Sequence, residues 1–134
     1  MLSLKPKTDI TTLEDIKLLV DSFYTAVRQD ELLSPIFNEV IKDNWPIHLE
    51  KMYRFWQTVL LDTQSYFGSP FVPHAKLPIY QRHFDRWLEL WTSVIDNNFI
   101  GPTAEDAKWR AGKMATMFLS KLEYYRNHPG QPLV

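Results

Sequence analysis

The stretch Ile47–Asp62, IHLEKMYRFWQTVLLD, decides the fold. Its apolar side chains recur every three or four residues, which places His48, Met52, Phe55 and Val59 on one stripe of an α-helix. A proline directly precedes the stretch, where a missing N–H costs nothing because the first helical turn has no acceptor for it. The sequence therefore predicts a helix that turns a histidine toward the core.

Two more helical patterns precede this stretch. Apolar residues follow the helical period over Leu13–Arg28, and Thr11 with Glu14 fits a capping box at its start. A Ser-Pro pair then introduces a short helical stretch, Ile36–Ile41. The sequence therefore predicts two helices before the one that carries His48.

The residues that follow the stretch change character. No helical period survives over Thr63–Leu77, where one glycine and two prolines interrupt regular structure around His74. Helical patterns return over Pro78–Asn97 and over Thr103–Arg126, where Thr103 begins the helix as its cap. We therefore expect an irregular segment that presents a second histidine.

These patterns predict an all-α fold, since no stretch alternates with the period of a strand. A chain of 134 residues is about the size of one domain, because a second core would leave each half too small. We expect one domain over residues 1–134, with its core at about 12–126 and a loose tail at 127–134.

Composition and charge exclude several classes of protein. The 15 basic and 16 acidic residues give a net charge of −1, which argues against binding to nucleic acid or to an anionic membrane. Without cysteine, the chain has no disulfides, thiolate metal sites, iron–sulfur clusters or thioether-linked heme. No stretch resembles a signal peptide or a membrane span, so we expect a cytoplasmic protein.

Local motifs for common enzyme chemistry are also missing. The sequence has no phosphate-binding glycine loop, no H-E-x-x-H zinc motif and no paired E-x-x-H motifs of a di-iron site. Four residues with polar tips remain on or beside apolar surfaces, namely Tyr24, His48, His74 and Trp87. Each alone is ordinary, but together they could surround a flat apolar ligand such as heme, whose iron takes a neutral imidazole.

Five motifs in order make the interpretation specific: F-Y-x-x-V-R-x-D at Phe23–Asp30, P-I-F at Pro35–Phe37, H-x-x-x-M-x-x-F-W at His48–Trp56, Y-x-G-x-P-x-x-x-H at Tyr66–His74 and H-F-x-R-W-L-x-L-W at His83–Trp91. With them, the chain resembles a truncated hemoglobin of the third group over about residues 13–126. These are bacterial globins with a shortened 2-on-2 helical sandwich that encloses heme.

The resemblance implies a role for each polar residue of the expected pocket. His74 corresponds to the proximal iron ligand, and Tyr24, His48 and Trp87 correspond to the distal residues that stabilise a bound ligand. His48 is in addition a candidate sixth iron ligand. These residues are also the candidates for a catalytic role.

The resemblance further implies how the cofactor is held. Phe37 packs on the heme face, Met52 and Phe55 line the distal wall, and His83 lies at the pocket edge among the heme-binding residues. Because no cysteine is present, the expected cofactor is heme b, held without covalent bonds.

The function expected from this resemblance is binding of O2, NO, CO or peroxide at heme iron. Redox chemistry such as NO detoxification or peroxide reduction fits better than O2 delivery, and it requires a reductase; we expect a monomer. Two alternatives come from the residues alone: a non-heme helical interaction module, and a zinc-binding bundle that uses His48, His74 and His83.

Overall fold

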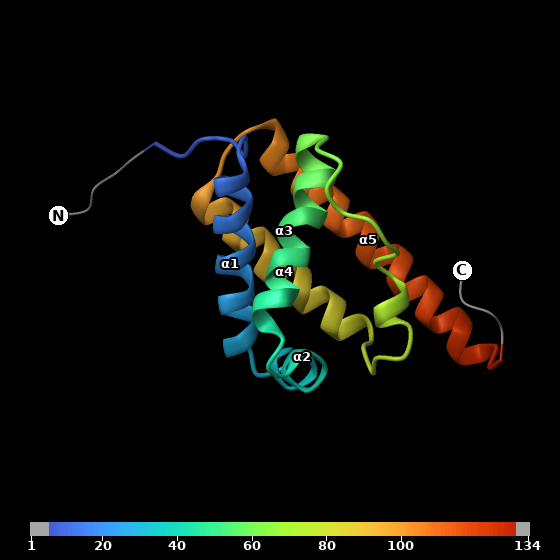
Figure 1. Cartoon of the computed structure of the whole chain (residues 1–134). Helices are drawn as coiled ribbons and strands as arrows, with labels where there is room; N and C mark the ends of the chain where they lie inside the picture. The colour runs from blue at the N-terminus through green and yellow to red at the C-terminus, as the bar shows by residue number, and fades with distance from the viewer. Residues whose placement is uncertain (1–5, 131–134) are drawn as a thin grey trace.

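A computed structural model describes residues 6–130 of the chain, so the last four residues of the expected tail lie outside the described residues. Within that range the structure contains five α-helices and one short 3-10 helix, and no strand (Figure 1). They are α1 Leu13–Gln29, α2 Ser34–Ile41, α3 Trp45–Leu61, η1 Val72–His74, α4 Gln81–Asn98 and α5 Pro102–Asn127.

The helices form two crossed antiparallel pairs. In Figure 1, α1 lies beside α3 and α4 lies beside α5, and within each pair the chain directions oppose. The pairs meet where α1 packs on α4 and α3 touches α5, while α2 packs on α1 alone among the major helix contacts. This arrangement confirms the predicted all-α, two-over-two sandwich.

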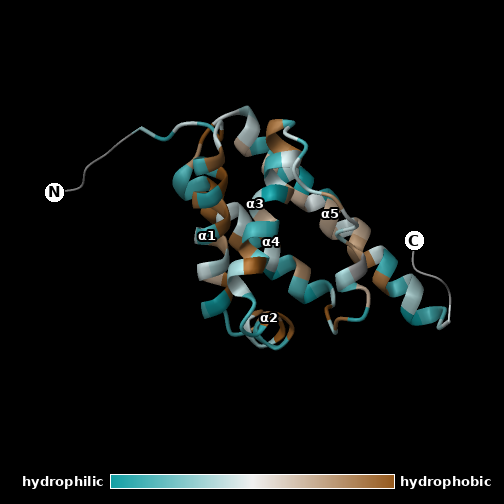
Figure 2. Ribbon diagram, viewed as in Figure 1, coloured by the Kyte–Doolittle hydropathy of each residue, from teal (hydrophilic) through white to brown (hydrophobic). Residues whose placement is uncertain are grey.

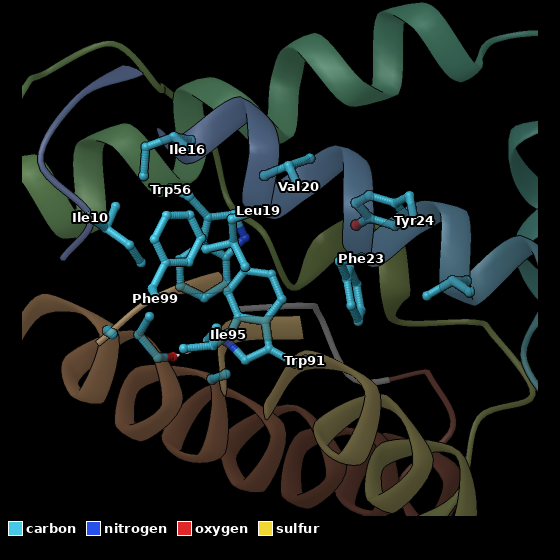
Figure 3. Close-up of a cluster of buried hydrophobic side chains, with 14 of the residues drawn as sticks. Ile10, Ile16, Leu19, Val20, Phe23, Tyr24, Trp56, Trp91, Ile95 and Phe99 are labelled. Atoms are coloured by element: carbon cyan, nitrogen blue, oxygen red, sulfur yellow. Dashed lines mark hydrogen bonds between the residues drawn. The ribbon is translucent and has the colours of Figure 1, made fainter. Parts of the chain in front are cut away.

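The larger core cluster lies between α1, α3 and α4. Figure 2 shows apolar residues concentrated on the inward faces of the helices. Phe23 and Trp91 are about 1% exposed, and Trp56 is 3% exposed. Figure 3 shows these rings together with apolar side chains from the start of α1 and the end of α4. Burial of this much aromatic surface is the main force that holds the two pairs together.

A second, smaller cluster joins α4 and α5 to the segment after α3. Phe71 and Ile79 come from that segment, and they pack with Phe118 and Leu122 of α5. Trp87 of α4 packs against both clusters. It therefore lies at the border between the two clusters.

The starts of α1, α2 and α3 differ slightly from the sequence prediction, and α3 begins at Trp45, two residues before the predicted Ile47. The capping box of α1 uses Thr12 and Asp15, one residue later than the predicted Thr11 and Glu14. Both pairs satisfy the same spacing rule, and the structure selects the one whose carboxylate also accepts from the Thr11 N–H. The second helix begins at Ser34, two residues earlier than predicted.

The start of α4 is a larger correction, because the helix begins at Gln81 and Pro78 lies outside it. The Tyr80 N–H donates to Nδ1 of His83, which caps the helix. Upstream, the carbonyl groups of Leu77 and Ile79 accept hydrogen bonds from Nη2 of Arg126. These long-range bonds hold the preceding residues in an extended path, which local spacing could not reveal.

The predicted Thr103 cap of α5 is also wrong. The cap residue is Gly101, and the helix starts at Pro102 without a side-chain cap of its own. Instead, the carboxylate of Asp9 accepts hydrogen bonds from the backbone N–H groups of Thr103 and Ala104, at 2.9 and 2.8 Å. A residue more than ninety positions away thus satisfies the first turn of the last helix.

Candidate functional site

The first histidine of the candidate site lies on the inward stripe of α3. The ring of His48 meets the edges of Tyr24 and Trp45, with centroid separations of 5.0 and 5.8 Å. Its Nε2 is buried without a hydrogen-bond partner among the described residues. Burial, reinforced by the charges of His74 and Lys51, lowers the pKa of His48 to about 4. His48 is therefore neutral near pH 7. Its buried Nε2 is free to form a hydrogen bond or an iron bond with a group bound in the site.

The second histidine ends the short η1 helix. Nδ1 of His74 lies 2.6 Å from the carbonyl oxygen of Pro70, and its ring packs on Phe118 at a centroid distance of 5.0 Å. Because a carbonyl can only accept, Nδ1 carries the proton and Nε2 carries the lone pair. Burial holds the pKa of His74 below its usual value. The residue is thus a neutral imidazole of fixed tautomer, the form that ligates a metal.

The candidate distal donors come from α1 and α4. Tyr24 is buried, and burial raises the pKa of its phenol, so the hydroxyl keeps its proton. The hydroxyl of Tyr24 and the indole N–H of Trp87 make no hydrogen bond to any residue of the described chain. The edge of Phe23 packs against both rings, at 5.0 Å from Tyr24 and 5.7 Å from Trp87. Phe23 therefore packs against both candidate donors, neither of which has a hydrogen-bond partner among the described residues.

The predicted lining residues are apolar and incompletely covered. Phe37, Met52, Phe55 and Trp87 pack against the larger cluster, yet each remains partly exposed. Phe37 meets the ring of Tyr24 at 6.0 Å, which places the second helix beside the distal donors. These side chains offer flat apolar surface next to the polar groups described above.

His83 has a different environment from the other histidines. It is buried, its Nδ1 accepts from the Tyr80 N–H, and its ring packs on Tyr80 at 6.1 Å. Burial and the nearby charges of Arg82 and Arg126 lower the pKa of His83. The structure thus gives this residue a capping role in α4, while its predicted contact with a cofactor stays a prediction.

Two residues of the site escaped the sequence analysis. Pro70 supplies the carbonyl that fixes the tautomer of His74, and Trp45 walls the site beside Tyr24 and His48. Spacing could have indicated Trp45, because it precedes His48 by three residues and so shares its helix face. A backbone acceptor such as the Pro70 carbonyl has no sequence signal.

The donor set and its surroundings fit heme. His74 offers one neutral imidazole with an oriented lone pair, and heme iron needs a single such ligand from one side. His48 approaches from the other core cluster, near enough for the charge of His74 to lower its pKa. Within residues 6–130 no three His, Asp or Glu side chains gather as a metal cluster would require. The ligand set therefore suits heme better than the zinc bundle.

Comparisons with known proteins agree with this geometry. The family model of bacterial-like globins matches residues 9–119. The chain is 33% identical over 119 residues to the group 3 truncated hemoglobin ctb of Campylobacter jejuni, covering 86% of this chain and 94% of that protein. The crystal structure of a group III truncated hemoglobin from Campylobacter jejuni superposes with a TM-score of 0.81 at 31% identity, covering 90% of this chain and 98% of the other.

The fold and the site together define a heme-binding globin with a two-over-two helical sandwich. The chain belongs to the bacterial-like globin family, and its similarity is to the truncated hemoglobins of the third group. The alternative of a non-heme helical interaction module gives way to this assignment. None of the helices in the described part of the chain is long and apolar enough to cross a membrane.

Proposed function

We propose that the protein holds heme b without covalent bonds and uses O2, NO or peroxide in redox chemistry rather than in O2 delivery. The observation that carries this proposal is a set of three polar groups that have no hydrogen-bond partner within residues 6–130. They are the Tyr24 hydroxyl, Nε2 of His48 and the indole N–H of Trp87. Donors of this kind retain a small, partly negative ligand instead of releasing it readily.

The proposed roles follow from the protonation states of the residues. His74 supplies Nε2 to the iron while the Pro70 carbonyl holds its Nδ1–H. Tyr24 stays protonated, so its O–H donates to the ligand, and Trp87 donates through its indole N–H. Phe37, Met52, Phe55 and His83 complete the proposed set of residues that contact the cofactor. When bound, heme supplies an iron centre that takes diatomic ligands and exchanges single electrons.

His48 has two possible uses in this proposal. Its neutral ring either donates to the distal ligand or provides a sixth iron ligand when no other ligand is present. A change of the ferric spectrum from six-coordinate to five-coordinate in His48→Ala would assign the second use. An unchanged ferric spectrum would exclude the second use.

The proposed reactions require an electron donor. Conversion of NO and O2 to nitrate consumes one electron for each nitrate, so a reductase is the expected partner. The balanced total charge of the chain gives no hint of a docking patch for it. We further propose that the chain is a single globin domain and acts as a cytoplasmic monomer.

The test is rapid mixing of the reduced, heme-loaded protein, equilibrated with O2, with NO. Nitrate formed in proportion to the protein supports the proposal, as does consumption of hydrogen peroxide by the ferric protein. If neither nitrate forms nor peroxide is consumed, and O2 simply dissociates, the redox function is wrong. Free hemin at the same concentration is the control.

A further inference from the structure

Three indole rings form a continuous stack from the candidate site into the larger core. The planes of Trp87 and Trp91 are parallel within 2°, with centroids 6.0 Å apart. Trp91 stacks in turn on Trp56 at 4.5 Å and 28°. Figure 3 shows Trp56 beside Trp91 in the core. Both separations lie in the range of offset aromatic stacking. The three rings therefore form an unbroken aromatic path from Trp87 at the site to Trp56 on α3.

The middle of this stack is dry and fixed. Trp91 and Trp56 are 1% and 3% exposed, so water does not reach their rings. The indole N–H of Trp91 donates to the Ala107 carbonyl at 3.1 Å. An amide carbonyl is too weak a base to take this proton. If Trp91 loses one electron, it therefore keeps its proton and can accept an electron again without rearrangement.

A tyrosine with a proton acceptor lies where the stack reaches α3. Tyr53 precedes Trp56 by three residues on α3, so the two side chains project from adjacent turns on one side of the helix. Its hydroxyl donates to Oδ1 of Asp21 on α1. Burial, together with the hydrogen bond and charge of Asp21, raises the pKa of Tyr53 to about 12. The phenol is thus protonated, with a carboxylate in place to take its proton.

We propose that Trp87, Trp91, Trp56 and Tyr53 form an electron relay between the heme pocket and the surface of α3. The inference rests on the proposed function, because the oxidant is a peroxide that reacts in that pocket. Hydrogen peroxide takes up two electrons and two protons to give two molecules of water. The relay delivers both electrons to the pocket, one after the other, and solvent provides both protons.

The electron moves along the relay in single steps. Trp87 gives one electron to the pocket, Trp91 refills Trp87, and Trp56 refills Trp91. Tyr53 then refills Trp56 and passes its phenolic proton to Asp21, which leaves a neutral tyrosyl radical. A one-electron donor such as ascorbate returns the electron to Tyr53, and Asp21 returns the proton. The oxidising equivalent thus moves from the core to Tyr53 before the buried indole rings are damaged.

Other aromatic residues provide matched controls. Tyr66 reaches Trp56 only through the ring of Phe55, which is much harder to oxidise than indole or phenol. Trp109 lies exposed on α5, and its recorded ring contact is with the ammonium group of Lys113. Neither residue belongs to the stack.

The experiment mixes ferric, heme-loaded protein with one equivalent of hydrogen peroxide and freezes it for electron paramagnetic resonance. Peptide mass spectrometry then maps oxidised side chains. We expect a tyrosyl radical that Tyr53→Phe abolishes, with oxidation then accumulating on Trp56 and Trp91. Trp91→Phe should abolish the same radical, whereas Trp109→Phe and Tyr66→Phe should leave it unchanged.

The outcomes separate failure of the proposed electron relay from failure of the proposed function. A tyrosyl signal that survives in Tyr53→Phe, or peroxide consumption without a protein radical in the wild type, overturns the relay and leaves the proposed function intact. A wild-type chain that binds no hemin overturns both. If Trp91→Phe fails to fold, Tyr53→Phe still decides, because its side chain is only partly buried at the surface.

Discussion

His74 lies near enough to His48 for its charge to lower the pKa of His48, although His48 belongs to α3 and His74 ends η1. The charge of a protonated His74 adds to burial in lowering the pKa of His48. Both imidazoles are consequently neutral near pH 7. Two neutral histidines that come near each other from different elements are what a site between proximal and distal ligands requires.

Replacement of His74 by alanine should remove the axial ligand. The ferrous His74→Ala protein is expected to lose the absorption spectrum of an imidazole-ligated heme, because no other described imidazole takes this position. Added free imidazole should restore the spectrum, since the lost ring leaves space beside Phe118. His128→Ala is the matched control, because His128 lies exposed beyond α5. An unchanged spectrum in His74→Ala would refute the proximal assignment.

Removal of the Tyr24 hydroxyl should accelerate the release of O2. A hydrogen bond to a charged acceptor contributes roughly 1.5–3 kcal/mol, so Tyr24→Phe should raise the O2 dissociation rate about 10- to 100-fold. Stopped-flow displacement of O2 by CO measures this rate. The exposed Tyr124→Phe should not change it. Equal rates in Tyr24→Phe and wild type would exclude Tyr24 as a donor.

The contact between Asp9 and α5 should make stability depend on pH. Burial alone would raise the pKa of Asp9, but hydrogen bonds from Thr103, Ala104 and Ile10 outweigh it and hold the pKa below 3.8. A lowered pKa in the folded state stabilises the fold above that value, and this contribution is lost as the pH falls through the folded pKa.

Asp9→Ala should therefore lower the free energy of unfolding at pH 7 by about 0.5–2 kcal/mol, the usual effect of a lost helix cap. The difference from wild type should shrink as the pH falls below 3.8. Urea denaturation at several pH values measures both effects. A difference that stays constant down to pH 3 would contradict the charged role of Asp9.

Replacement by alanine should change the stability of the fold in opposite directions at Gly101, the cap of α5, and at Gly112 inside that helix. Gly101 has φ +143°, and a Cβ there would lie 2.5 Å from Cγ of Asp9. Gly101→Ala should destabilise the fold by roughly 1–3 kcal/mol through backbone strain and this clash. Gly112 lies inside the helix with nothing within 4 Å of its Cβ position, so Gly112→Ala should stabilise by about 0.5–1 kcal/mol. Thermal unfolding of both variants checks the contrast, and a stabilised Gly101→Ala would disprove it.

Helix existence was predictable from the sequence because apolar periodicity directly reports which face is buried. The stripe of α3 placed His48 inward, and the structure confirms that orientation. Boundaries were predictable only where the cap is local. The start of α4 depends on Arg126, and the start of α5 depends on Asp9, so no local rule contains the deciding contact.

The site was less accessible to sequence reasoning than the fold. An irregular segment carries His74, and periodicity says nothing about where such a segment lies; the family resemblance supplied its pairing with His48. The stack of Trp87 on Trp91 follows from i, i+4 spacing on one helix. Its continuation to Trp56 depends on how α3 crosses α4, which spacing alone does not determine.

The heme site is tested most directly by titration of the heme-free chain with hemin, followed by reduction and addition of CO. We predict saturation at one hemin per chain and a Soret band that shifts sharply when CO binds to the reduced protein. A chain that gains no Soret band beyond that of free hemin would contradict the assignment of His74 and His48 to a heme site.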